Sequence, residues 1–277
     1  MVGSQRAPRL YRPRPAGGGH TAPSHPVTLS AMQPLTACLL VSAALAGASG
    51  QVVTPWLDGY SGQHQTGSLI TYHDSASSLG GWNDVMRSAC INGFWVFFEH
   101  DQFNYDAGRV LWSYGFNYCF TFKADFDQQT SSIRRVGDYY DAAADSLSLY
   151  EGTYFSGKQV FTESYLSTIG TAYGYQSVIV TGPDAWTIYS GDNYTGYSVC
   201  LYSGSDSAVS PSGQKITYGL FPTADYLGVV GSDIRSARKG CYSGVTLRGQ
   251  PLTAENHIST VVEEDTTSGG VGRAGSN

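Results

Sequence analysis

The chain of 277 residues repeats one short unit: an aromatic residue, four residues, a second aromatic, one further residue and a glycine. It reads Tyr150-Glu151-Gly152-Thr153-Tyr154-Phe155-Ser156-Gly157 and later Tyr189-Ser190-Gly191-Asp192-Asn193-Tyr194-Thr195-Gly196. The glycine supplies a positive φ that other residues resist. If the two aromatics pack across the turn, the unit predicts a folded hairpin closed like a corner.

Two further copies depart from this pattern. Residues 98–105 have Tyr105 where glycine is expected, and residues 56–62 are one residue short. Further along from each hairpin lies a serine-bearing segment, at 83–88, 127–134, 176–179 and 232–236. A serine hydroxyl can tie its own chain back onto the hairpin. Because one unit cannot cover its own apolar face, the four copies, which fill about residues 52–241, must pack in pairs as sandwiches.

Short aromatic-rich or alternating runs, separated by Gly, Asn, Asp and Ser, indicate an all-β protein. We expect strands at 94–98, 119–122, 147–150, 177–180, 186–189 and 197–202, with a weaker candidate at 228–231. The segment 139–144, which follows Asp138 as a candidate N-cap, is either a short helix or the linker between the two halves.

These motifs resemble those of the βγ-crystallin superfamily, whose domains each contain two Greek-key motifs with this hairpin and a later serine. Phe98-Glu99 and Tyr150-Glu151 match the aromatic-Glu start that is common in the family. The stretch 83–90 is similar to the Asn-Asp-x-x-Arg-Ser-Cys stretch of lens members. The resemblance implies two Greek-key β-sandwich domains of βγ-crystallin type, at about 52–137 and 146–241.

The resemblance also implies calcium binding, because members of the family often bind Ca²⁺ through an Asn/Asp-Asn/Asp-x-x-Ser/Thr-Ser motif. Carboxylate, amide, hydroxyl and carbonyl oxygens suit this ion. In the family, the hairpin of one motif completes the site of its partner. The weak calcium candidates are therefore Asn83, Asp84, Asp127, Gln128, Ser131, Asp58 and Glu99.

The four copies differ in how well they keep this motif. The first has Arg87 in place of the hydroxyl, which brings a repelling charge, and the second has Gln128, which is longer than the usual Asp or Asn. In the other two copies, residues 172–173 and 231–232 occupy the paired positions without a carboxylate. We expect at most one or two weak sites, both in the N-terminal half. The alternative is that these polar residues only cap the hairpins.

The segment 35–46, LTACLLVSAALA, is shorter than the roughly 20 apolar residues that a membrane span needs. It has the length of the apolar region of a signal peptide, and small residues follow at 46–50. We expect a signal at about 32–50, starting at Met32, and a mature chain that begins near Gln51. Residues 1–31 are then a long n-region or an upstream extension. The alternative is that 35–46 is a buried helix.

Cysteine usage agrees with secretion. Cys38 leaves with the signal, and the even number that remains favours disulfides over free thiols in a secreted chain. Three pairings are open, and we favour those that keep each bond within one half of the chain: Cys90 with Cys119, and Cys200 with Cys241. Zinc binding is not indicated, because the sequence has no Cys-x-x-Cys spacing.

Charge and composition describe the surface. Beyond residue 50 the chain has 12 basic and 22 acidic residues, which disfavours nucleic acid and anionic membranes as partners. Asn193 begins a glycosylation sequon, 203–214 is a Ser/Gly-rich surface loop, and 246–277 is a flexible acidic tail by composition. A monomer and self-association both stay open.

Catalytic motifs are poorly represented. The sequence has no Gly-x-Ser-x-Gly elbow, His-Glu-x-x-His or Walker loop. Glu99 and Glu151 do not indicate a glycosidase pair, because both occupy equivalent repeat positions. We therefore expect a secreted non-enzymatic protein with a structural or protective role, with no cofactor or weak Ca²⁺. The alternative is a secreted binding effector, toxin-like or a protease inhibitor, that acts through the 203–214 loop. A hydrolase using His73 or His100 is the third reading.

Overall fold

The computed structural model describes residues 52, 54–105, 108–170, 174–204, 207–228 and 234–249, and the strand 259–261. All of the described residues belong to one compact unit. The expected signal at 32–50 and the extension 1–31 lie outside the described residues. Within the described ranges, no helix has both the length and the apolar character needed to cross a membrane.

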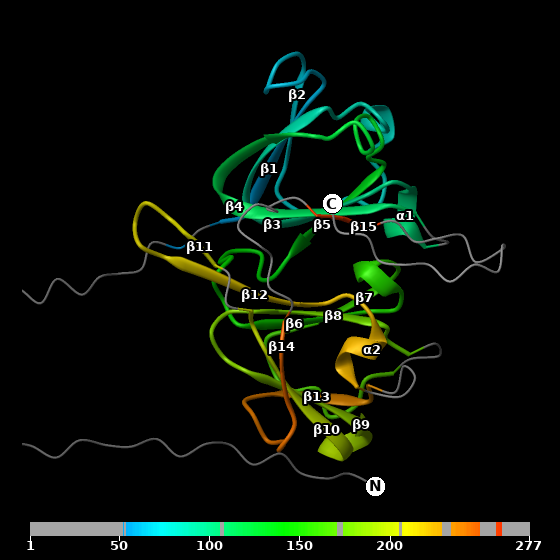
Figure 1. The fold of residues 1–277 in the computed structure, drawn as a ribbon, viewed down its shortest axis with the longest axis vertical. Helices are drawn as coiled ribbons and strands as arrows, with labels where there is room; N and C mark the ends of the chain where they lie inside the picture. The colour runs from blue at the N-terminus through cyan, green and yellow to red at the C-terminus, as the bar shows by residue number, and fades with distance from the viewer. Residues whose placement is uncertain are drawn as a thin grey trace, which may run out of the picture. The chain divides into compact units, whose positions relative to one another are not determined.

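The first half of the chain, together with β15 from the C-terminal segment, forms a six-stranded sheet with the order β15-β4-β3-β1-β2, in which β5 also pairs with β3 (Figure 1). Its strands are β1 (Trp56–Tyr60), β2 (Leu69–Tyr72), β3 (Ser88–Phe98), β4 (Val110–Thr121), β5 (Ser132–Val136) and β15 (Ser259–Val261). The long strand β3 changes partners along its length: residues 88–92 pair with β1, and residues 94–98 pair with β5. The two parts of β3 therefore belong to the two layers of the sandwich, one with β1 and the other with β5. The short helices are η1 (Gly80–Trp82) and α1 (Asp101–Asn104).

The second half forms two separate sheets. The first, in the order β11-β12-β8-β6-β7, contains β6 (Ser146–Tyr150), β7 (Gln159–Thr162), β8 (Ser177–Thr181), β11 (Ser207–Val209) and β12 (Lys215–Phe221). The other, in the order β13-β9-β10-β14, contains β9 (Trp186–Gly191), β10 (Thr195–Tyr202), β13 (Ser236–Lys239) and β14 (Thr246–Arg248). The short helices are η2 (Thr153–Phe155), η3 (Asp192–Tyr194) and α2 (Ala224–Leu227).

Neighbouring copies of the repeat exchange strands. Strands β7, β6 and β8 come from the third copy, and β12, which completes their sheet, comes from the fourth. In return, Leu166 of the third copy bridges Ala237 in β13, and in the first half Ala76 bridges Ile133 in β5 in the same way. This reciprocal exchange is the Greek-key arrangement. It confirms the predicted all-β sandwich fold.

Burial follows the same pairing. One apolar cluster contains residues of the first half only and is centred on Trp95 and Phe97, and a second contains residues of the second half only and is centred on Trp186. A third cluster draws on both halves, where Trp112 and Tyr114 meet Phe155 and Tyr218. The division into domains at 52–137 and 146–241 stays a prediction, because this shared cluster lies within a single compact unit.

All four hairpins have the same backbone. Two consecutive residues in each have a left-handed φ, between 51° and 67°, at 64–65, 102–103, 154–155 and 193–194. A serine at the start of the later strand donates to a hairpin carbonyl at 2.6 Å and accepts an N–H from the second left-handed residue. These serines are Ser88, Ser132, Ser177 and Ser236. The serine ties predicted from the sequence are therefore present in every copy.

The first hairpin lies later in the chain than the sequence indicated. It spans 60–67 rather than 56–62, because Gln65 donates its N–H to Ser88 where the other copies use an aromatic residue. Gly67, with φ of 81°, takes the place of the glycine that ends the unit.

We expect Ser177→Ala to lower the free energy of unfolding by about 2–3 kcal/mol, because two buried backbone groups lose their partner. The Ser177 hydroxyl is fully buried, donates to the Gly152 carbonyl at 2.6 Å and accepts the Phe155 N–H at 2.9 Å. Urea denaturation measures the loss. The matched control is Ser164→Ala at an exposed position, expected to change stability by less than about 0.5 kcal/mol. Equal effects of the two variants would contradict a stabilising role for the tie.

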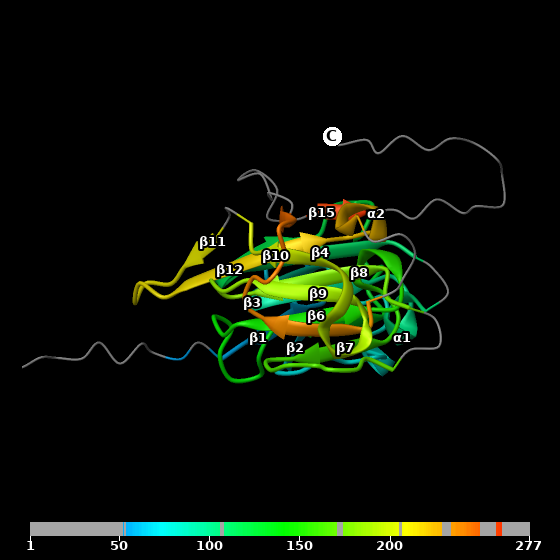
Figure 2. The same ribbon diagram turned by 90° about the horizontal axis from the view of Figure 1, so that it is seen from below.

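Three other expectations differ from the structure. Residues 139–144, for which a short helix and a linker were the alternatives, form turns, and the Asp138 carboxylate caps the first of them by accepting the N–H groups of Tyr140 and Asp141. The 203–214 segment is partly strand: β11 pairs with β12 in a hairpin that extends away from the sheets in both views (Figures 1 and 2). The expected tail contributes β14, which is parallel to β10, and β15, which pairs with β4. The candidate strand 228–231 begins at Gly228, the C-cap of α2, and its other residues lie outside the described ranges.

Both favoured disulfides are present. Cys90 and Cys119 face each other across β3 and β4, with Cα atoms 3.9 Å apart. Cys200 of β10 is bonded to Cys241, which lies between β13 and β14. Each bond therefore joins segments within one half of the chain.

Candidate calcium site

Three oxygen atoms from the first two repeat copies meet at Ser131. The Ser131 hydroxyl donates to the Glu99 carbonyl at 2.6 Å and lies 3.4 Å from a carboxylate oxygen of Asp84. The Asp84 N–H in turn donates to the Thr130 carbonyl at 3.0 Å. The carboxylate, the hydroxyl and the Glu99 carbonyl form a set of hard oxygen ligands of the kind that Ca²⁺ prefers.

The local backbone explains this grouping. Asp84 has a left-handed φ of 55°, a conformation that aspartate tolerates better than most residues, and this brings it beside Thr130. Ser131 comes directly before β5, and its own N–H donates to the Phe98 carbonyl at 2.9 Å. Asn83 donates its amide to the other carboxylate oxygen of Asp84 at 3.3 Å, so it orients the ligand.

A second position is related to the first by the exchange of the two copies. Gln128, with φ of 57°, donates its N–H to the Met86 carbonyl, as Asp84 does to Thr130. Arg87 donates its N–H to the Tyr60 carbonyl at 2.9 Å, as Ser131 does to Phe98. The equivalent of Asp84 is therefore a neutral amide, and the equivalent of the Ser131 hydroxyl is a guanidinium.

This second position supplies its own cation. Arg87 binds Asp127 through two nitrogens, with a shortest distance of 2.7 Å. The hydrogen bond to Asp127 raises the pKa of Arg87 above its ordinary value. The charge of Asp127 is thereby balanced by that of Arg87. A metal ion at this position is disfavoured, because the guanidinium already occupies it and would repel a second cation.

Glu99 contributes through its carbonyl rather than its carboxylate. Its side chain accepts hydrogen bonds from the Arg109 side chain at 2.6 Å and from the Arg109 N–H at 2.8 Å. The Arg109 side chain lowers the pKa of Glu99, so the carboxylate is held ionised by an internal partner. The same guanidinium also binds Gln129 at 2.7 Å, which holds the loop before Thr130 and Ser131 in place.

Asp58 lies apart from this group. It faces Thr71 across β1 and β2, and its carboxylate accepts the Thr71 hydroxyl at 2.5 Å. Sequence reasoning named Glu99 but not its carbonyl, since a backbone ligand leaves no residue-type signal. In the described parts of the chain, no three His, Cys, Asp or Glu side chains cluster in a way that could hold a metal. The third and fourth motifs begin at 172–173 and 231–232, outside the described residues.

Among solved structures, Geodin, a βγ-crystallin from Geodia cydonium, matches over both halves of the chain. The match has a TM-score of 0.51 at 16% identity and covers 67% of this chain and 99% of Geodin. The chain has the βγ-crystallin fold. Shorter matches include a βγ-crystallin from an archaeon (22% identity, 35% of this chain and 98% of that one, TM-score 0.27) and one from Ciona intestinalis (21%, 34% and 98%, 0.26). No protein-family model matches the sequence, and no curated protein does.

Within this βγ-crystallin fold, the remaining candidates occupy turns. Asn193 is exposed in the hairpin of the fourth copy, where its backbone N–H donates to the Ser167 carbonyl, and its glycosylation stays a prediction. His73 and His100 are both exposed, and the carboxylate of Glu99 is bound to Arg109. Within the described residues, neither histidine forms a hydrogen bond or an ion pair with a carboxylate. The oxygen group around Ser131 is therefore the candidate site with the best-defined chemistry.

Proposed function

We propose that this chain is a secreted, non-enzymatic protein with a structural or protective role and one weak calcium site. The observation that carries the calcium proposal is the contact of Ser131 with Asp84 and the Glu99 carbonyl, together with the ion pair that fills the equivalent position. Two disulfides support secretion, because such bonds persist in oxidising compartments. The four tied hairpins and three buried clusters support a durable structural role.

The affinity follows from the ligands. Calcium sites tighten with the number of charged ligands and with rigidity. Asp84 is the only carboxylate in the group and is exposed to solvent, so we expect a dissociation constant of about 10⁻⁴–10⁻³ M, as in extracellular calcium modules.

Asp84→Ala is expected to abolish calcium binding, while Asp127→Ala retains it, because only Asp84 faces the Ser131 hydroxyl. Isothermal titration calorimetry with CaCl₂ measures both variants against the unaltered protein, which we expect to bind one equivalent. A calcium-dependent rise in the melting temperature that is lost in Asp84→Ala is the second readout. The absence of binding in the unaltered protein at about 10 mM, ten times a millimolar dissociation constant, would overturn the proposal. If Asp127→Ala lost binding while Asp84→Ala retained it, calcium would bind at the second position, beside Asp127, and the assignment to Asp84 and Ser131 would be wrong.

The double variant Arg87→Ser, Gln128→Asp is expected to raise the stoichiometry from one calcium ion to two. These changes give the second position the hydroxyl and carboxylate that the first one has, and they remove the internal cation. Gln128→Asp alone is the control, since Arg87 then still occupies the position. A second equivalent in this control would show that the Arg87 ion pair does not block the metal.

A further inference from the structure

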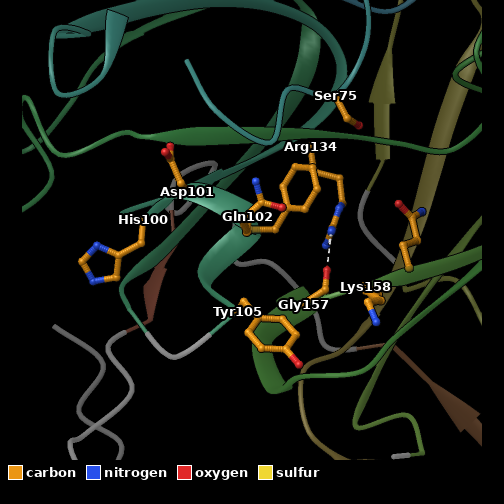
Figure 3. Close-up of a pocket in the computed structure, with 10 residues that line it drawn as sticks. Ser75, His100, Asp101, Gln102, Tyr105, Arg134, Gly157 and Lys158 are labelled. Carbon is orange, nitrogen blue, oxygen red and sulfur yellow. Dashed lines mark hydrogen bonds between the residues drawn. The ribbon is translucent and has the colours of Figure 1, made fainter. Parts of the chain in front are cut away.

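A cavity of about 970 Å³ lies between the hairpin of the second copy and that of the third (Figure 3). None of the calcium candidates lines it, although His100 and Asp101, which do, directly follow Glu99 in the chain. From the first half it is lined by Gln102, Phe103, Tyr105 and Arg134, and from the second by Lys158 and Gln159. The hairpins are joined beneath it, because the Gly157 N–H donates to the Phe103 carbonyl at 2.9 Å. The cavity is thus built on fixed backbone.

Arg134, in the wall of this cavity, is a buried cation. It is 2% exposed and donates to the carbonyls of Phe155 and Gly157 at 2.5 and 2.6 Å, and Figure 3 shows its side chain reaching Gly157. Among the described residues it makes no ion pair. Its guanidinium carries five N–H donors, and these two carbonyls accept from two of its nitrogens.

The Arg134 guanidinium also lies over the rings of Phe103, Tyr150 and Phe98, at 3.9, 5.1 and 5.3 Å, but none of these partners carries a formal negative charge. Because buried charges are normally paired with an opposite charge, an anion beside the guanidinium is favoured. Desolvation by burial lowers the pKa of Arg134 to about 10. Lys158 adds a second cation on the exposed wall and has no ion pair within the described residues. Asp101, the acid that lines the cavity, is bound to Ser78 at 3.1 Å.

The rest of the lining indicates the body of the ligand. Gln102 and Gln159 supply amide groups, and Tyr105 presents a ring that is 60% exposed. Amides bind hydroxyl groups, and an exposed ring offers an apolar face on which a sugar can stack. Polyanions are disfavoured, because the chain beyond residue 50 has 22 acidic and 12 basic residues.

We propose that this cavity binds a sugar acid, a polyhydroxylated molecule with one carboxylate or sulfate, whose anionic group lies at Arg134 and Lys158 and whose ring lies against Tyr105. An Arg–carboxylate or Arg–sulfate contact is charge-assisted and stronger than a neutral hydrogen bond. The anionic group therefore supplies most of the affinity, and the amides and ring supply selectivity for the sugar.

The test is an NMR titration of the ¹⁵N-labelled full chain with D-glucuronate, D-glucose 6-sulfate and D-glucose. We expect saturable shifts at the amides of Gln102 and Lys158 with one or both acids, and binding of neutral glucose at least about tenfold weaker. The two acids distinguish a carboxylate from a sulfate ligand. Equal binding of glucose, shifts confined to other surfaces, or no saturable shift with either acid at about 10 mM would each overturn the proposal.

Variants locate the site independently of folding. Lys158→Gln is expected to weaken binding of the preferred acid about tenfold, and Tyr105→Ala should also weaken it. Both side chains are exposed, so neither change removes core packing. Lys215→Gln, at an exposed position of β12 that does not line the cavity, is the control. Equal affinities for Lys158→Gln and Lys215→Gln would overturn the proposal even if the acid binds.

Discussion

Replacing Phe155 with alanine is expected to lower the free energy of unfolding by about 3–5 kcal/mol, the usual cost of removing a buried aromatic residue. The ring is fully buried and packs edge-on against Tyr150, at 5.7 Å between centroids, and against Trp112 of the first half, also at 5.7 Å. Its removal therefore leaves a cavity in the cluster that both halves share. Urea denaturation followed by tryptophan fluorescence measures the loss.

Tyr194→Ala is the matched control, because Tyr194 has the same place in the fourth hairpin. Both residues have a left-handed φ, 67° and 63°, so backbone strain is nearly equal in the two alanine variants. Tyr194 is only half-buried and contacts Tyr189 at 5.8 Å, so we expect a loss of about 1–2 kcal/mol. Equal losses would contradict the conclusion that burial between the halves, rather than the hairpin itself, sets the cost.

The repeat could be predicted from the sequence because its serines and left-handed residues are local requirements of each hairpin. The first copy shows the limit of this reasoning. Gln65 has no aromatic ring, yet its N–H still donates to Ser88 at 2.9 Å, and its side chain reaches the Phe120 carbonyl. The backbone bond is the constant feature of the hairpin, while the aromatic residue depends on what packs over it. A pattern based on aromatics therefore misplaced the hairpin.

The calcium candidates show a different limit. Asp84 and Ser131 are 47 residues apart, and Arg87 and Asp127 are 40 apart. Which carboxylate faces the hydroxyl and which faces the guanidinium depends on how two copies exchange strands. The sequence indicated the residue types, but the grouping and the use of the Glu99 carbonyl come from the tertiary fold. Asp58 was a candidate because the sequence places the first hairpin at 56–62 and the family's hairpins complete the partner's site; in the structure it faces Thr71 instead.

Arg134 had no sequence signal of its own, although a second arginine has an equivalent place. Arg134 follows Ser132 by two residues, and Arg238 follows Ser236 by two. Each guanidinium lies over the second aromatic of its hairpin, Phe103 at 3.9 Å and Tyr194 at 5.3 Å. A cation over an aromatic ring is attractive. Two copies of the repeat thus contain the same arginine, buried in one and half-exposed in the other.

Arg134→Met is expected to lower the free energy of unfolding by about 3–5 kcal/mol, since it removes two charge-assisted hydrogen bonds and strands two buried carbonyls. Those carbonyls belong to Phe155 and Gly157, so the loss should loosen the contact between the second and third hairpins. Methionine keeps the apolar stem, which separates the loss of the guanidinium from a loss of volume. Hydrogen exchange should show weaker protection of the Gly157 amide, which donates to Phe103.

Arg238→Met is the control, with an expected loss of about 0.5–1 kcal/mol for a more exposed cation–aromatic contact. Its guanidinium donates to the Tyr189 hydroxyl at 3.0 Å rather than to buried carbonyls, so less is left unpaired. Replacement of a buried charge by an apolar side chain is neutral or stabilising where desolvation outweighs the bonds. A stabilised Arg134→Met protein would therefore show that the two carbonyls do not compensate the buried charge, and that Arg134 is retained for a reason other than stability.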